Sequence, residues 1–202
     1  MAASATAPAS QTSASEKTRQ GNNTGKGFWV ALAAPGHDAA AVMYWNPEWR
    51  ILVSGDALWE NGMGVVLAGD GDLTPYDRAA ETLAAIERLN PAWVVPGHGA
   101  PFASVAAALA RARERTEVLK SDPRKAARHV MKVMLIFSLL EAGRFEARDL
   151  PAMMTSVPVY RELNARYFGL APTEVATMLV GELERARVLE HRNGAYFPAI
   201  PA

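Results

Sequence analysis

Three short stretches decide how this chain folds: Pro35-Gly36-His37-Asp38, Ser54-Gly55-Asp56-Ala57 and Pro96-Gly97-His98-Gly99. Each follows a short apolar run and places one side chain that can bind a metal in a glycine turn. Such turns at strand ends let the backbone approach an ion closely and direct the side chain away from the sheet. Hard and borderline divalent metals accept a set of two histidines and one aspartate. We therefore expect His37, Asp56 and His98 to lie along one edge of a sheet.

The apolar runs around these turns predict alternating strands and helices. Strands are predicted at residues 28–33, 41–45, 50–53 and 93–95, of which the second and third form an antiparallel pair. Residues 60–75 are rich in glycine and predict a loop beside the expected site. The spacing of apolar residues predicts a helix over 76–89, which leads into the strand at 93–95 as in a β-α-β unit. A second long helix is predicted to end near Asp122-Pro123.

From residue 124 onward the sequence is helical, and glycine turns of this kind cease. Helices are predicted at 125–142, 148–154 and 172–186, followed by a hairpin over 188–197. Asn193-Gly194 favours a primed hairpin turn. Three helices followed by a hairpin is the order of a winged-helix domain. We divide the chain into a low-complexity tail, 1–26, a first domain, 27–122, and a second domain, 123–202.

Composition limits the classes of function. The chain has 202 residues, of which 50% are hydrophobic and 21% charged, and its formal net charge is zero, so the whole-chain field attracts neither nucleic acid nor anionic membrane. It has no cysteine, which excludes disulfides, thiolate ligands and a cysteine nucleophile. Residues 1–26 lack the apolar core of a secretory signal, and no apolar run is long enough to span a bilayer. We expect a disordered tail, a cytoplasmic protein and no membrane partner.

In this order and context, the three stretches resemble the second half of the metallo-β-lactamase-fold hydrolases, over about residues 28–120. The resemblance implies an α/β fold, the C-terminal half of an αββα sandwich, followed by a winged-helix extension such as some members carry. It implies that His37 is the third histidine of a first metal site, that Asp56 bridges both metals, and that His98 completes the second site. Aspartate rather than cysteine at the bridging position is similar to the glyoxalase-II and ribonuclease-like branches.

The resemblance also implies a chemistry. The family uses two divalent cations, most often zinc, and a metal-bound hydroxide that hydrolyses an ester, thioester, lactone or phosphodiester. A small-molecule substrate is therefore expected, and no catalytic side chain besides the ligands is assigned. Trp45, Trp49 and Trp59 flank the motif loops and are predicted either as core residues or as walls of a substrate pocket. His129 is predicted as a helix-surface or core residue, and His191 as an exposed one.

The sequence lacks the family's first half, whose His-x-His-x-Asp-His motif supplies four of the expected metal ligands. One half alone would expose a sheet face that is core in the complete fold. Two hypotheses follow: a truncated gene product that is impaired as a monomer, or a homodimer whose two copies pair face to face and rebuild a site. The rival interpretation is an inactive remnant, or a protein that binds a partner or nucleic acid through its winged-helix domain. Glutamates on the 172–186 helix make nucleic acid the less favoured partner.

Overall fold

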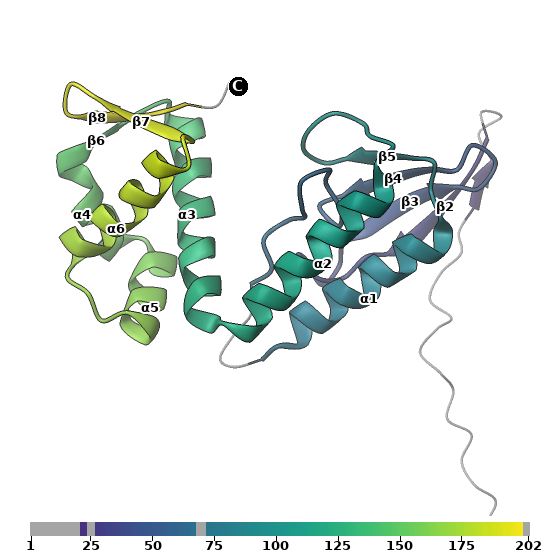
Figure 1. Ribbon diagram of the computed structural model, residues 1–202, viewed down its shortest axis with the longest axis horizontal. Coiled ribbons are helices and arrows are strands. Elements are labelled where there is room, and N and C mark those ends of the chain that lie inside the picture. The colour runs from purple at the N-terminus through teal and green to yellow at the C-terminus, as the bar shows by residue number, and fades with distance from the viewer. Residues whose placement is uncertain (1–20, 24–26, 68–71, 200–202) are drawn as a thin grey trace, which may run out of the picture.

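The computed structural model describes residues 21–23, 27–67 and 72–199, and two packed parts are visible in Figure 1. The first part is a five-stranded sheet with the order β1-β2-β3-β4-β5, covered on one face by two helices. Its elements are β1 (Gly21–Asn23), β2 (Phe28–Ala33), β3 (Val42–Asn46), β4 (Ile51–Gly55), α1 (Thr74–Leu89), β5 (Trp93–Pro96) and α2 (Val105–Ser121). The predicted mixed α/β class is therefore confirmed.

The pairing of the strands brings two of the predicted glycine turns to one edge. β2, β3 and β4 pair in antiparallel fashion, whereas β4 and β5 pair in parallel with α1 between them. The predicted β-α-β unit is thus confirmed, and the carboxyl ends of β4 and β5 lie at the same edge. The pairing shifts between Val53 and Gly55, where Gly55 has a φ of 54°. Glycine adopts this left-handed conformation without the clash that a Cβ would cause.

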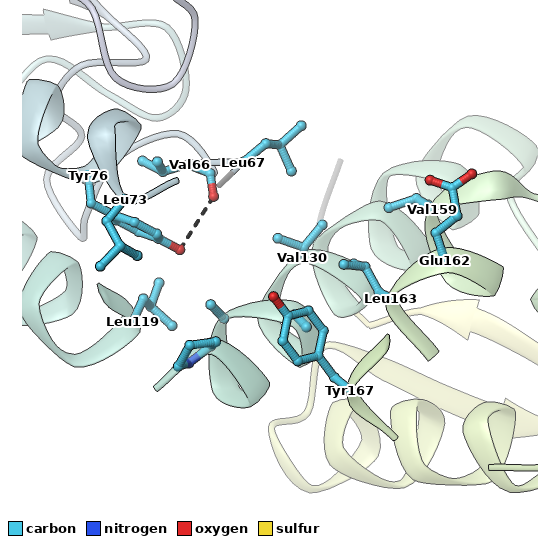
Figure 2. Close-up of a pocket in the computed structure, with 13 residues that line it drawn as sticks. Val66, Leu67, Leu73, Tyr76, Leu119, Val130, Val159, Glu162, Leu163 and Tyr167 are labelled. Carbon is cyan, nitrogen blue, oxygen red and sulfur yellow. Dashed lines mark hydrogen bonds between the residues drawn. The ribbon is translucent and has the colours of Figure 1, made fainter. Parts of the chain in front are cut away.

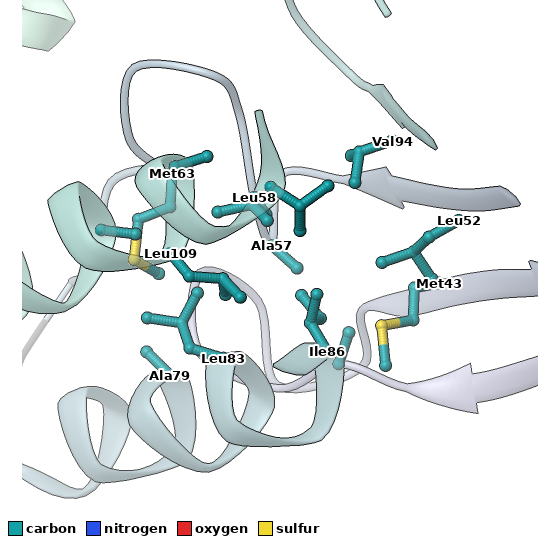
Figure 3. Packing of buried hydrophobic residues seen from close by; sticks show 14 of the residues in the cluster. Met43, Leu52, Ala57, Leu58, Met63, Ala79, Leu83, Ile86, Val94 and Leu109 are labelled. Carbon is teal, nitrogen blue, oxygen red and sulfur yellow. The ribbon is translucent and has the colours of Figure 1, made fainter. Parts of the chain in front are cut away.

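The larger core lies between the inner face of the sheet and the two helices (Figure 3). Met43 and Leu52 of the sheet are buried together with Leu83 and Ile86 of α1 and with Leu109 of α2. The buried positions on α1 recur at intervals of three and four residues, which places them on one face of the helix. This core fixes β4 and β5, and with them the loops that follow these strands.

The opposite face of the sheet carries apolar side chains that are about half exposed in the described part of the chain. Val42, Tyr44 and Trp93 are 46%, 49% and 50% exposed, and on their strands they alternate with buried side chains. Tyr44 pairs with Val53, and Val53 pairs with Val95, so apolar side chains form a row across three strands. The exposed sheet face expected from the sequence is present in the described part of the chain.

The second part is mainly helical. It contains α3 (Pro123–Ala142), η1 (Ala147–Asp149), α4 (Leu150–Ser156), α5 (Pro158–Tyr167), α6 (Pro172–Arg185) and a small sheet of β6 (Phe145–Glu146), β8 (Ala195–Pro198) and β7 (Leu189–Arg192). Its core is separate from the first and is built around Met131, Leu135 and Leu139 of α3. The predicted hairpin is confirmed, since Asn193 and Gly194 have φ values of 51° and 78°, as a primed turn requires.

Several elements differ from the prediction. Helix α5 was not predicted, because a helix of ten residues is too short to be stable by itself and gains its stability by packing against α3. Strand β1 falls within the predicted disordered tail, and it pairs with β2 through backbone hydrogen bonds that need no apolar side chains. The rest of that tail lies outside the described residues. Helix α1 begins at Thr74, inside the segment predicted as loop.

The two long helices α2 and α3 meet at Asp122. The Asp122 carboxylate accepts a hydrogen bond from the Lys125 backbone N–H at 2.9 Å, and Pro123 occupies the first turn of α3. These features stop α2 and start α3 in a new direction. Across the described residues, no helix is both long and apolar enough to cross a membrane.

His129 of α3 is half-buried near the α2–α3 junction. Burial, and then the charges of Arg115 and Lys132, lower the pKa of its imidazole from 6.5 to about 4. At pH values between about 4 and 6.5, the His129 imidazole is protonated in the unfolded chain but not in the folded chain. The free energy of unfolding therefore falls as the pH is lowered from neutrality toward 4.

We predict that His129→Gln makes the free energy of unfolding less dependent on pH, because the glutamine takes up no proton in either state. The measurement is urea unfolding of both proteins at several pH values between about 7.5 and 5. His191→Gln is the matched control, since His191 is exposed and its loss should leave the slope near that of the unmodified chain. An unchanged slope in His129→Gln would contradict the prediction.

Candidate metal centre

The fold brings the three predicted donors together. His37 follows β2, Asp56 follows β4 and His98 follows β5. The Asp56 carboxylate lies between the two imidazoles: its Oδ2 is 3.5 Å from His37 Nε2, and its Oδ1 is 3.8 Å from His98 Nε2. All three side chains are partly exposed, so the group is accessible from solvent.

A backbone carbonyl fixes the orientation of His37. Its Nδ1 lies 2.6 Å from the carbonyl oxygen of Val65. Because a carbonyl oxygen can only accept a hydrogen bond, Nδ1 carries the proton in this contact and Nε2 presents a lone pair. Nε2 is the nitrogen that faces Asp56, so the contact with Val65 holds His37 in a tautomer suited to binding a metal.

Trp59 holds Asp56 from another side. Its indole Nε1 donates a hydrogen bond to Asp56 Oδ1 at 3.2 Å, and its ring packs edge-on against His98 with the ring centres 5.0 Å apart. Trp59 therefore lies in the site, as one of its two predicted roles required. Trp45 is buried in the core and Trp49 is exposed beside Trp29, so neither reaches the donors.

Two backbone segments lie close to the donors: the loop after Asp56, which contains Gly64, and the turn after β5, which contains Gly97. A Cβ built at Gly64 would lie 2.8 Å from both Asp56 Cβ and His37 Cγ, and one built at Gly97 would lie 2.9 Å from Asp56 Oδ1. The Gly64 backbone N–H also donates to the Asp56 carbonyl at 2.8 Å. Only residues without a side chain fit at these two positions. The sequence placed a glycine-rich loop here, but its spacing did not indicate that Gly64 and Val65 touch the donors.

Helix α3 closes the site from the second part of the chain. Val133, Met134 and Phe137 line a cavity of about 260 Å³ together with the three donors. The Phe137 ring lies 6.1 Å from the His98 ring, between ring centres. The apolar face of this helix was predicted, but its contact with the donors is a tertiary contact that local periodicity does not report.

The donor types fit a divalent metal. Two imidazole nitrogens face one carboxylate, and each carboxylate oxygen faces a different imidazole, which is an arrangement in which aspartate can bridge two cations. Each side then has two protein donors. No group of three or more His, Cys, Asp or Glu side chains among the described residues is arranged to hold one ion. The described donors would therefore fill only part of the coordination sphere of zinc or a similar ion, which has room for further ligands.

We predict that Gly64→Ala lowers the free energy of unfolding by about 1–3 kcal/mol, because the added methyl group overpacks the space between Asp56 and His37. The measurement is urea unfolding. Gly181→Ala is the control: its Cβ would meet only Arg185 Nη1 at 3.7 Å, and alanine should stabilise helix α6 by about 0.5–1 kcal/mol. Equal effects of the two substitutions would show that the loop wall is not tightly packed.

Comparison with solved structures gives matches that cover about half of each matched protein. A metallo-beta-lactamase family protein from Thermus thermophilus is 21% identical, with a TM-score of 0.41, and the match covers 91% of this chain and 53% of that one. A beta-lactamase domain protein from Burkholderia ambifaria is 20% identical, with a TM-score of 0.46 and coverages of 90% and 51%. A metallo-beta-lactamase from Pontibacter korlensis is 20% identical, with a TM-score of 0.38 and coverages of 50% and 47%. The chain spans about half the length of these proteins.

A family model matches the part of the chain that carries the candidate site. Comparison with curated proteins gives no match. The model of the metallo-beta-lactamase superfamily matches residues 13–98, a segment that contains His37, Asp56 and His98. The fold described above is consistent with that match. Over residues 13–98 the chain is thus similar to the metallo-beta-lactamase superfamily.

Proposed function

We propose that the chain supplies His37, Asp56 and His98 to the metal centre of a hydrolase that acts on an ester, thioester, lactone or phosphodiester. The observation that carries this proposal is the position of the Asp56 carboxylate, with one oxygen toward each imidazole Nε2. Two divalent cations, most often zinc in the family that the chain resembles, are the expected cofactor. The aspartate in the bridging position supports a glyoxalase-II-like or ribonuclease-like branch.

The protein groups around the donors have separate tasks in this reaction. A bound divalent cation supplies a water of lowered pKa and polarises the bond to be cleaved. Val65 and Trp59 hold His37 and Asp56 in place, and the apolar side chains of α3 limit the water around the substrate. In hydrolysis of an ester, the water oxygen bonds to the acyl carbon, the bond to the leaving group breaks, and the leaving group departs with a proton. Among the described residues that line the cavity, the donors are the only ones with an acidic or basic side chain, so we assign no separate general base.

The second part of the chain supports the hydrolase interpretation. We propose that it is a winged-helix extension, since α6 is followed by the β7–β8 hairpin and the third strand β6 pairs with β8. Its helix α3 lines the cavity of the donors. Glu182 of α6 forms ion pairs with Arg128 and Lys132 of α3, so both cations already have a partner within the fold. We therefore prefer a role in closing the hydrolase site over a role in binding nucleic acid.

We predict that the purified chain binds Zn²⁺ and that Asp56→Ala weakens this binding at least about tenfold, since both imidazoles then lose their shared carboxylate. His37→Ala and His98→Ala should each remove part of the binding. The measurement is calorimetric titration with Zn²⁺, combined with the metal-dependent hydrolysis of 4-nitrophenyl acetate and its loss on chelation.

Two control variants remove the same chemical groups elsewhere. Glu48→Ala removes an exposed carboxylate from the β3–β4 turn, at the end of β4 remote from Asp56, and His191→Ala removes an exposed imidazole. Both should bind Zn²⁺ like the unmodified chain. Zinc binding that is equal in Asp56→Ala and in the controls would refute the proposal, as would a chain that binds no zinc.

A further inference from the structure

A second cavity lies between the two parts of the chain, and the proposed chemistry does not use it. Its volume is about 270 Å³. Figure 2 shows Tyr76 and Leu119 on the side of the first part, and Leu163 and Tyr167 on the side of the second. Val130 of α3 also lines it, and this residue is only 5% exposed although it lies between the two hydrophobic cores. The cavity is therefore a space that the packing of the two cores leaves open.

The described residues that line this cavity place no charge toward its interior. Glu162 is the charged residue among the described lining, and its side chain is 68% exposed and paired with Arg161 at 3.2 Å. The Tyr76 hydroxyl donates to the Val66 carbonyl at 3.5 Å, and burial raises the pKa of its phenol, so it stays neutral. No lysine, arginine or histidine is among the described residues that line the cavity. An anionic group such as a phosphate would find no partner there, whereas an apolar group would.

The cavity adjoins the candidate metal centre. Leu67 lines both the second cavity and the cavity of the donors. On α3, Val130 lines the former and Val133, about one turn further along, lines the latter. Leu67 is 58% exposed, so a largely exposed side chain borders both spaces. Apolar surface thus continues from the donors to the space between the two parts.

We propose that this cavity binds an apolar chain of the substrate while its acyl group lies at the donors. This inference rests on the proposed function, and it narrows the substrate to an ester or thioester of a hydrophobic acyl group. An apolar cavity of about 150 Å³ accommodates benzene. The larger space here fits a short hydrocarbon chain, and its described lining is mostly apolar.

The first test is binding without metal. The probe is N-phenyl-1-naphthylamine, a neutral apolar dye whose fluorescence rises in apolar sites, displaced by decan-1-ol in the presence of a chelator. Val159→Phe places a larger side chain in the cavity, and Leu67→Asp, at an exposed position, places a charge beside it. Each should weaken binding of the displaceable probe at least tenfold.

Two control variants separate the cavity from other apolar surfaces. Val157→Phe makes the same change two residues before Val159, at a position that does not line the cavity, and Tyr44→Glu alters the exposed sheet face. Both should bind the probe like the unmodified chain, with thermal unfolding recorded for every variant. If Val159→Phe does not fold, probe binding by Leu67→Asp alone tests the assignment of the cavity. Binding that survives in Leu67→Asp, or that is lost in Tyr44→Glu, would overturn the assignment.

The second test is hydrolysis by the zinc-loaded chain. The ratio of kcat/KM for 4-nitrophenyl decanoate over 4-nitrophenyl acetate should exceed one, and should fall at least tenfold in Val159→Phe but not in Val157→Phe. Hydrolysis of both esters with an unchanged ratio would overturn this inference and leave the proposed function standing. Failure of the proposed function has another signature: neither ester is hydrolysed, whereas probe binding is still lost in Leu67→Asp. That result would overturn the assignment of the bound chain to a substrate.

Discussion

The structure depends on one constraint, the sharing of helix α3 between two hydrophobic cores. Near its start, Ala126 belongs to the core of the sheet and of helices α1 and α2. Further along, Met131, Leu135 and Leu139 belong to the core of α4 and α6. A continuous helix of 20 residues is stiff, so its two ends hold the parts of the chain in a fixed relation. Residues of α3 outside both cores line the two cavities: Val130 lines the cavity between the parts, and Val133, Met134 and Phe137 line the cavity of the donors.

The donors were predictable because they depend on local features that the sequence displays. An apolar run, a glycine turn and a histidine or aspartate follow one another within a few residues, so each strand end could be found separately. Asp56 and His98 share an edge because their strands pair in parallel. The helical spacing over 76–89 predicts this pairing, since a helix between two strands indicates a parallel crossover. The pairing of β4 with β5 is thus a long-range contact that could be inferred from a short-range pattern.

The surroundings of the donors were not predictable in the same way. Val65 and Gly64 lie near His37 in space although Val65 is 28 residues away in the sequence. A glycine-rich sequence does not indicate which of its glycines will face a donor. Phe137 approaches His98 only because α2 ends at Asp122 and α3 turns back over the site. Helix α5 was missed for a related reason, since it has only ten residues and its stability comes from packing against α3. Local periodicity predicts elements, whereas the walls of a site depend on angles between them.

The contact between Trp59 and Asp56 gives the site an intrinsic optical signal. The indole N–H that bonds to the carboxylate belongs to a fluorophore whose emission responds to hydrogen bonding and to the polarity around it. An ion that draws Asp56 toward itself competes for the same oxygen, and a molecule seated beside His98 meets the indole ring directly. Of the five tryptophans, Trp45 is buried in the first core and cannot respond to such events in the same way. Occupancy of the donors can therefore be followed in the unlabelled chain by tryptophan fluorescence.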